Sequence, residues 1–182
     1  AVRRATHFNH IIGLDELEVV LTDGSRQSLL LFVDDASGFT VVIPLRQGGQ
    51  KGINSQEFQT AVSRGWIAWA GPPEFIRLDP HRAHVSEQTK LFCEQNGIAP
   101  LLAPAEAHNQ NAQAERRIDM FKDHFTRVSH QCSLTAEDDP WIWSSKIAAA
   151  QNTHLRIAGH SPNQFVFGRD PRVPTSLLSD EG

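Results

Sequence analysis

The stretch IIGLDELEVVL, residues 11–21, alternates along its length with the period of two that is typical of a β-strand. Asp15 shares one strand face with Leu17, whereas the two glutamates point to the other face. LLLFVDD at 29–35 and FTVVIPL at 39–45 have the composition of two further strands, each preceded by a short turn. Three consecutive strands with short turns predict an antiparallel meander that opens the domain.

The rest of the chain mixes helical and strand patterns. Apolar spacing and capping residues predict helices at 54–71, 86–97, 111–130, 139–155 and 161–168. Short apolar runs predict strands at 74–79 and 98–103. The order is therefore three antiparallel strands, helix, strand, helix, strand and then helices. This order predicts an α/β protein with a mixed five-stranded sheet flanked by helices, as in the ribonuclease-H-like fold.

Composition narrows the class of protein. The 182 residues are 40% hydrophobic, which suffices for one domain with a sizeable core. Cys93 and Cys132 do not form a disulfide scaffold, so we expect a reducing intracellular setting. No apolar run approaches the ~20 residues of a membrane span, and no membrane partner is expected. A net charge of −4 argues against a freestanding nucleic-acid binder but not against a nuclease with an acidic metal site.

Three carboxylates stand out because of their positions. Asp15 lies on the apolar strand face, where a charge is costly unless it is paired, metal-bound or at the rim of the sheet. Asp79 ends a strand, and α/β proteins bind ligands beyond strand ends. Glu115 falls roughly 100° from the apolar stripe of its helix, at the margin of the buried face. Taken singly, each also has a structural explanation: Asp15 as a solvated aspartate at a strand start, Asp79 as an Asp-Pro turn, which is favoured for it in isolation, and Glu115 as an acid in the first turn of a helix.

The spacing of these carboxylates is more specific than any one of them. Between Asp79 and Glu115 there are 115 − 79 − 1 = 35 residues, which is the D,D-35-E pattern. In this pattern the chain resembles the integrase catalytic cores of retroviruses and long-terminal-repeat retrotransposons. FNHIIGLDELEV resembles the first-aspartate strand of that family, and HNQNAQAERR is similar to its Q-N-G-x-x-E-R stretch. NTHLRIAGHSPNQFVFGRDPRVP resembles the segment that follows the core in these retrotransposons, so the resemblance spans about 8–174.

The resemblance implies a DDE-type polynucleotidyl transferase. In such an enzyme Asp15, Asp79 and Glu115 would be the catalytic residues and the ligands of a two-ion Mg²⁺ or Mn²⁺ site. The reactions implied are 3′-end processing of the element's DNA and strand transfer into host DNA. The implied organisation is a catalytic core at 8–135, a C-terminal helical extension at 136–174 and a linker at 175–182.

The resemblance also implies partners. Element ends and target DNA would lie along the groove beside Glu115, with Lys122, Arg116, Asn111 and Gln113 as DNA-binding residues. Lys122 lies seven residues beyond Glu115 and therefore almost on the same line along the helix. Arg116 either contacts phosphate or buttresses the helix. A homo-oligomer, the other integrase modules of a parent polyprotein and a nuclear location follow from the same resemblance.

Two departures from the family pattern leave alternatives open. DPHRAHVS, residues 79–86, lacks the glycine and the acid that the family places after its second aspartate, and Ala112 replaces a glycine. One alternative is another ribonuclease-H-like transposase or nuclease. The other is a degenerate integrase core that is catalytically inactive and serves as a nucleic-acid-binding or assembly module.

Overall fold

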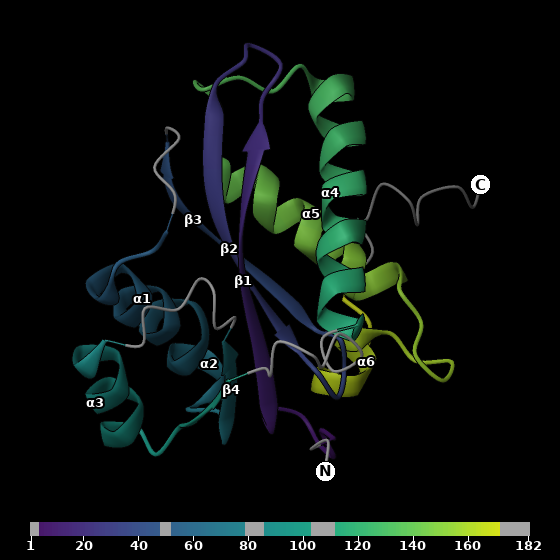
Figure 1. Ribbon diagram of the computed structural model, residues 1–182. Coiled ribbons are helices and arrows are strands. Elements are labelled where there is room, and N and C mark those ends of the chain that lie inside the picture. The colour runs from purple at the N-terminus through teal and green to yellow at the C-terminus, as the bar shows by residue number, and fades with distance from the viewer. Residues whose placement is uncertain (1–3, 48–51, 79–85, 103–111, 172–182) are drawn as a thin grey trace.

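The described part of the protein is a three-layer arrangement of helices around one sheet (Figure 1). The computed structural model describes residues 4–47, 52–78, 86–102 and 112–171. The sheet has the strand order β3-β2-β1-β4-β5. Its strands are β1 (Ile11–Val20), β2 (Arg26–Asp34), β3 (Thr40–Gln47), β4 (Phe75–Leu78) and β5 (Ala99–Leu102).

The pairing of the strands confirms the mixed sheet expected from the sequence. β1 pairs with β2, and β2 with β3, in antiparallel fashion. β1 pairs with β4, and β4 with β5, in parallel fashion; the chain runs through β2, β3 and the helices from α1 to α2 between the first two, and through α3 between the second two. The turn between β1 and β2 uses Gly24 at φ +82°, as expected for the Asp-Gly pivot. The predicted meander is therefore correct.

The helices also lie where the capping signals placed them. Asn54, Ser86, Asp139 and Ser161 each accept a hydrogen bond from a backbone N–H in the first turn of the following helix. None of the helices in the described part of the chain is both long and apolar enough to span a bilayer. The helices are α1 (Ser55–Val62), η1 (Ser63–Ile67), α2 (Ala68–Ala70), α3 (Glu87–Gln95), α4 (Ala112–Cys132), α5 (Pro140–His154) and α6 (Pro162–Phe167).

One predicted helix is interrupted. The pattern at 54–71 predicted a single regular helix, but η1 is a π-helical turn between α1 and α2. Gly65 lies in this turn, and a Cβ there would come within 2.7 Å of the Ile43 side chain. The helix therefore approaches β3 more closely than any larger residue permits, and the widened turn seats Trp66, which is fully buried, against Phe32.

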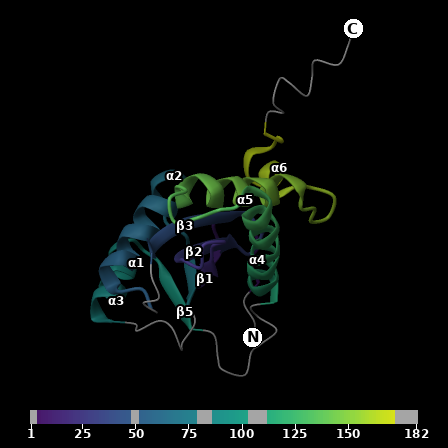
Figure 2. The same ribbon diagram turned by 90° about the horizontal axis from the view of Figure 1, so that it is seen from above.

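Helices lie on both sides of the sheet (Figure 2), and each face of the sheet carries its own hydrophobic core. On one face, β1 and β2 pack against α1, η1 and α3 through residues such as Ile12 and Trp66. On the other face, Leu17 and its neighbours on β2 pack against α4 and α5 through residues such as Ile118 and Phe121. Odd-numbered residues of β1 thus face α4, and Asp15 belongs to this set.

Asn9 ties the start of β1 to the end of the helix that precedes β4. Its backbone is in the left-handed region at φ +66°. Its Nδ2 donates to the carbonyls of Ala70, Gly71 and Pro72, and its Oδ1 accepts from Trp66 Nε1 at 2.7 Å. Asparagine tolerates this φ better than most residues, so one side chain satisfies both the backbone and its partners.

Two substitutions of Asn9 separate the contribution of its hydrogen bonds from that of its positive φ angle. We expect Asn9→Gly to lower the free energy of unfolding by about 1–3 kcal/mol, because Trp66 Nε1 loses its acceptor in the core. Asn9→Ala should cost about 1 kcal/mol more, since alanine also disfavours positive φ. Urea denaturation of both variants measures the difference. Equal losses would show that the φ angle is unstrained, and no loss in either would refute the role of the hydrogen bonds.

Candidate catalytic site

Asp15 sits in the middle of β1, on the face that α4 covers. It is half-buried and lies opposite Leu31 of β2 in the antiparallel register. Leu17, two residues on, and Leu31 both belong to the core beneath α4. The sheet thus holds the Asp15 carboxyl at the boundary between this core and solvent.

Glu115 lies in the first turn of α4 and is exposed. Ile118, three residues further along, is buried against the same core as Leu17. The expected position at the margin of the buried face is confirmed. Because α4 covers the face of β1 that carries Asp15, the two carboxylates lie on the same side of the sheet.

Asp79 lies outside the described residues, as do Asn111 and His108, and the side chain of Gln113 is likewise not described. The described parallel register of β1 with β4 ends with Gly13 opposite Arg77. Asp15 and Asp79 each follow two residues later in the sequence. Among the described residues, no three His, Cys, Asp or Glu side chains are arranged to hold a metal ion, and Asp79 is not among those residues.

A buried ion pair supports the strands at this point. Asp35 Oδ2 accepts from Arg77 Nη2 at 2.6 Å, and both side chains are about 10% exposed. Burial raises the pKa of the Asp35 carboxyl, Arg77 opposes this rise, and the neighbouring charge of Asp34 adds to it. The Asp35 N–H also donates to Ile11 O at 3.0 Å. Arg77, which precedes Asp79 by two residues in the sequence, is thus held in place.

Asp34 is fully buried and has a structural role. Its Oδ1 accepts from the Asn9 N–H, and its Oδ2 accepts from the backbone and hydroxyl of Ser37. Burial raises the pKa of Asp34, while these hydrogen bonds oppose the rise. These contacts hold the start of β1 and the turn after β2 together.

The basic residues of α4 differ in their surroundings. Arg116 and Lys122 are exposed, and Lys122 Nζ lies 3.4 Å from Asp119 Oδ1. Arg117, which the sequence did not single out, is half-buried and rests against Gly38, whose added Cβ would come within 2.6 Å of Nη2. Burial lowers the pKa of Arg117, and the charge of Arg116 adds to this effect. Its guanidinium has no ion-pair partner in the part of the chain that the structure describes.

Comparisons with known proteins give the fold family. No protein-family model and no curated protein sequence matches the chain. The HTLV-2 integrase catalytic core domain in complex with magnesium, in its dimeric form, superposes with a TM-score of 0.69 over 89% of this chain and 99% of that chain, at 21% identity. The BIV integrase catalytic core domain superposes with a TM-score of 0.66 over 86% of this chain and 92% of that chain, at 13% identity.

The chain has the fold of a retroviral integrase catalytic core. A chain of the simian T-cell lymphotropic virus intasome in complex with PP2A regulatory subunit B56 gamma also matches, with a TM-score of 0.73 and 20% identity. That match covers 96% of this chain but only 59% of the intasome chain. The expected fold class, a ribonuclease-H-like mixed sheet flanked by helices, is confirmed.

The buried pair of Asp35 and Arg77 generates a stability prediction. Asp35→Leu and Arg77→Met should each cost about 3–5 kcal/mol, because each leaves one buried charge without a partner. The double variant Asp35→Leu/Arg77→Met should recover most of that loss, since no charge is then buried. Urea denaturation of the three variants gives the coupling energy.

The pair of Glu18 and Arg26 is the matched control, since its atoms are 2.7 Å apart but its side chains are 27% and 56% exposed. Glu18→Ala should cost no more than about 1 kcal/mol. If the double variant at Asp35 and Arg77 is as unstable as the sum of the singles, the pair is not energetically coupled.

Proposed function

We propose that this chain is the catalytic core of a long-terminal-repeat retrotransposon integrase, a DDE-type polynucleotidyl transferase that processes the 3′ ends of element DNA and joins them to host DNA. The observation that carries the proposal is the register of β1 and β4 in a sheet with the retroviral integrase fold. The last described pair of this register is Gly13 and Arg77, and Asp15 and Asp79 each come two residues later in the sequence. Glu115 lies on α4, which covers the face of β1 that carries Asp15.

Carboxylate oxygens are the donors that hard divalent cations prefer, so the donor set of Asp15, Asp79 and Glu115 fits Mg²⁺ or Mn²⁺. Of these three residues, Asp15 and Glu115 are described: Asp15 is half-buried, Glu115 is exposed, and both lie on the same side of the sheet. The chemistry supplied by a bound pair of such ions is activation of an attacking oxygen and stabilisation of the leaving oxygen at phosphorus. The HTLV-2 core, which has the same fold, is in complex with magnesium.

The basic side chains of α4 would position the DNA backbone. Lys122 lies two helical turns, or roughly 10 Å, beyond Glu115 on the same helix line. Its contact with Asp119 is exposed at both ends and therefore competes weakly with a phosphate. Arg116 is exposed beside Glu115, and Asn111 and Gln113 complete the proposed set. Arg117 would buttress the start of the helix against the β2–β3 turn.

Self-association is part of the proposal. The HTLV-2 core is found in dimeric and trimeric forms, and the simian T-cell lymphotropic virus chain belongs to an intasome. Exposed aromatic side chains at Trp69, Trp141 and Phe167 would suit contacts between copies. Target DNA, other modules of the parent polyprotein and a nuclear site of action complete the proposed setting.

The catalytic proposal is tested on a short labelled duplex with Mg²⁺ or Mn²⁺. We expect Mn²⁺-dependent nicking or strand transfer, lowered about a thousandfold or more by Asp15→Asn, Asp79→Asn or Glu115→Gln, because metal-borne charge stabilisation is worth several kcal/mol. Mn²⁺ should support the reaction better than Mg²⁺, which demands more ideal geometry.

Asp123→Asn is the matched control, since Asp123 is an exposed acid on α4 at a different position from Glu115. This variant should retain full activity. If the unaltered, folded protein is no more active than the three carboxylate variants, the chain is a degenerate core that folds without catalysing. Equal loss in Asp123→Asn would show that the general acidity of α4, not a defined site, is responsible.

The DNA contact of Lys122 has its own test. Lys122→Ala should weaken binding to DNA ends of any sequence and lower the slope of log K against log salt by about 1, because one phosphate contact releases about one counterion. Lys90→Ala is the control, since Lys90 is equally exposed and also forms an i,i+3 ion pair, with Glu87 on α3. The same slope in both variants would exclude a phosphate contact at Lys122.

A further inference from the structure

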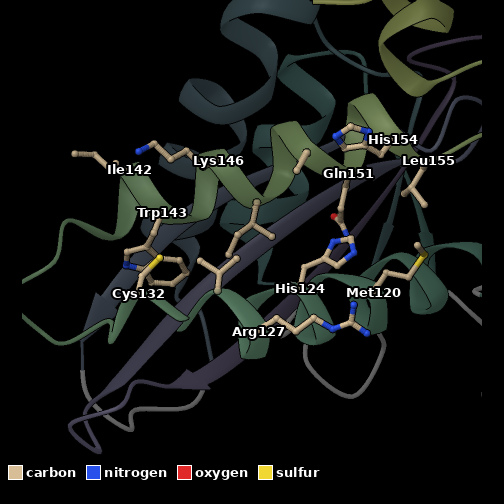
Figure 3. A pocket seen from close by; sticks show the side chains of 13 residues that line it. Met120, His124, Arg127, Cys132, Ile142, Trp143, Lys146, Gln151, His154 and Leu155 are labelled. Carbon is tan, nitrogen blue, oxygen red and sulfur yellow. The ribbon is translucent and has the colours of Figure 1, made fainter. Parts of the chain in front are cut away.

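A groove of about 590 Å³ runs between α4 and α5, on the outer side of the core that these helices form with the sheet (Figure 3). Its floor is apolar and includes Met120, Val128, Ile147 and Leu155. Ile142 and Cys132 lie at one end of the groove, and His154 and Leu155 lie at the other. A groove of this size and lining is typical of binding sites.

The charged residues of the groove all have the same sign. Arg127 and Lys146 are exposed on its two walls, one from α4 and one from α5, and His124 and His154 add two imidazoles. None of the described residues that line the groove is an aspartate or a glutamate. An occupant that combines apolar side chains with carboxylates would therefore complement this surface.

Three polar atoms in the groove wall lack partners. Trp143 Nε1, Gln151 Oε1 and His124 Nδ1 are buried without a hydrogen bond in the described structure, and the Trp143 and Gln151 side chains are 4% and 0% exposed. Figure 3 shows the Gln151 and His124 side chains extending toward each other across the groove. A buried unpaired donor or acceptor costs about 1–3 kcal/mol, so an occupant with hydroxyl or amide groups would relieve a cost already present.

The described chain leaves the fold near this groove. α6 packs on the end of α5 through a hydrogen bond of 3.1 Å from Asn163 Nδ2 to Thr153 Oγ1. Asp170 is tied to the start of α6, since its carboxylate accepts from Ser161 Oγ and Gln164 Nε2 at 2.8 Å each. The last described residue, Pro171, therefore follows directly on a helix that packs against the end of α5, where His154 and Leu155 line the groove.

We propose that the groove between α4 and α5 binds the chain's own C-terminal segment, residues 172–182. This segment, RVPTSLLSDEG, carries two adjacent leucines for the apolar floor and Asp180 and Glu181 for the basic walls. Its three hydroxyl side chains offer donors and acceptors for the unpaired atoms. Its 11 residues span up to about 36 Å when extended, whereas the 15 residues of α5 are about 22 Å long, so the segment reaches along the whole groove.

Cys132 provides the reporter because it is exposed and lines the groove, whereas the second thiol, Cys93, is buried on the other side of the sheet. In the full chain, the rate of Cys132 alkylation by neutral iodoacetamide is compared with that of Asp180→Lys/Glu181→Lys and of Leu177→Ser/Leu178→Ser. A short tether gives an effective concentration on the order of 1 mM, so a Kd of about 0.1 mM would slow alkylation about tenfold. Both variants should therefore react about tenfold faster than the unaltered chain.

Glu87→Lys/Glu94→Lys is the matched control, since it makes the same change of net charge at exposed acids on α3, away from the groove. It should leave the Cys132 rate unchanged. Lys146→Glu alone should expose Cys132, and its combination with Asp180→Lys/Glu181→Lys should restore protection. Slow labelling of Cys93 in every variant shows that the fold is retained.

Equal Cys132 rates in the unaltered chain and all variants would overturn the proposal. Protection that grows with protein concentration would also overturn it, because the groove would then be covered by a second copy of the chain. The readout is independent of DNA and of divalent metal, so it holds or fails separately from the proposed catalytic function.

Discussion

The ion pair between Asp35 and Arg77 joins the two halves of the sheet. Asp35 follows β2, in the turn before β3 of the antiparallel meander, while Arg77 belongs to β4, the first parallel strand. Arg77 lies opposite Gly13, and the Asp35 N–H binds Ile11 O, so one residue holds both β1 and β4. A buried charge without its partner is costly, and this cost makes the register specific. The relative placement of Asp15 and the end of β4 depends on that register.

The two faces of the sheet differ in what packs on them. On the face beneath α1, η1 and α3, large side chains pack around Trp66. Asn9, just before β1, hydrogen-bonds to Trp66 and to the end of α2. Among the described elements, α4 and α5 pack on the opposite face, and α4 carries the exposed Glu115 while it buries Phe121 fully. The same two helices leave the basic groove between them. Both proposed functions of the chain therefore use the face that α4 covers.

Much of the fold was predictable because strand alternation and helix caps depend on residues that are close together in the sequence. Alternation in 11–21 and the caps at Ser86 and Ser161 depend only on neighbouring residues, and each prediction is confirmed. The π-helical turn was missed because it results from the approach of Gly65 to Ile43, which are far apart in sequence. The partner of Arg77 and the groove between α4 and α5 were missed for the same reason, although an arginine within an apolar strand was a usable signal. Periodicity placed Asp15 on the apolar face of its strand and Glu115 beside the apolar stripe of its helix, but only the family resemblance predicted that they share one site, and the placement of Asp79 remains a prediction.

The central claim is that Asp15, Asp79 and Glu115 form one metal site on the α4 face of the sheet. A crystal structure of the chain soaked in Mn²⁺, with anomalous scattering to locate the ions, measures this directly. The account predicts Mn²⁺ bound by oxygens of all three residues, with their carboxyl groups within about 4–8 Å of one another, as two-ion sites require. Mn²⁺ bound elsewhere, or Glu115 turned away from an ion held by the two aspartates alone, would contradict it.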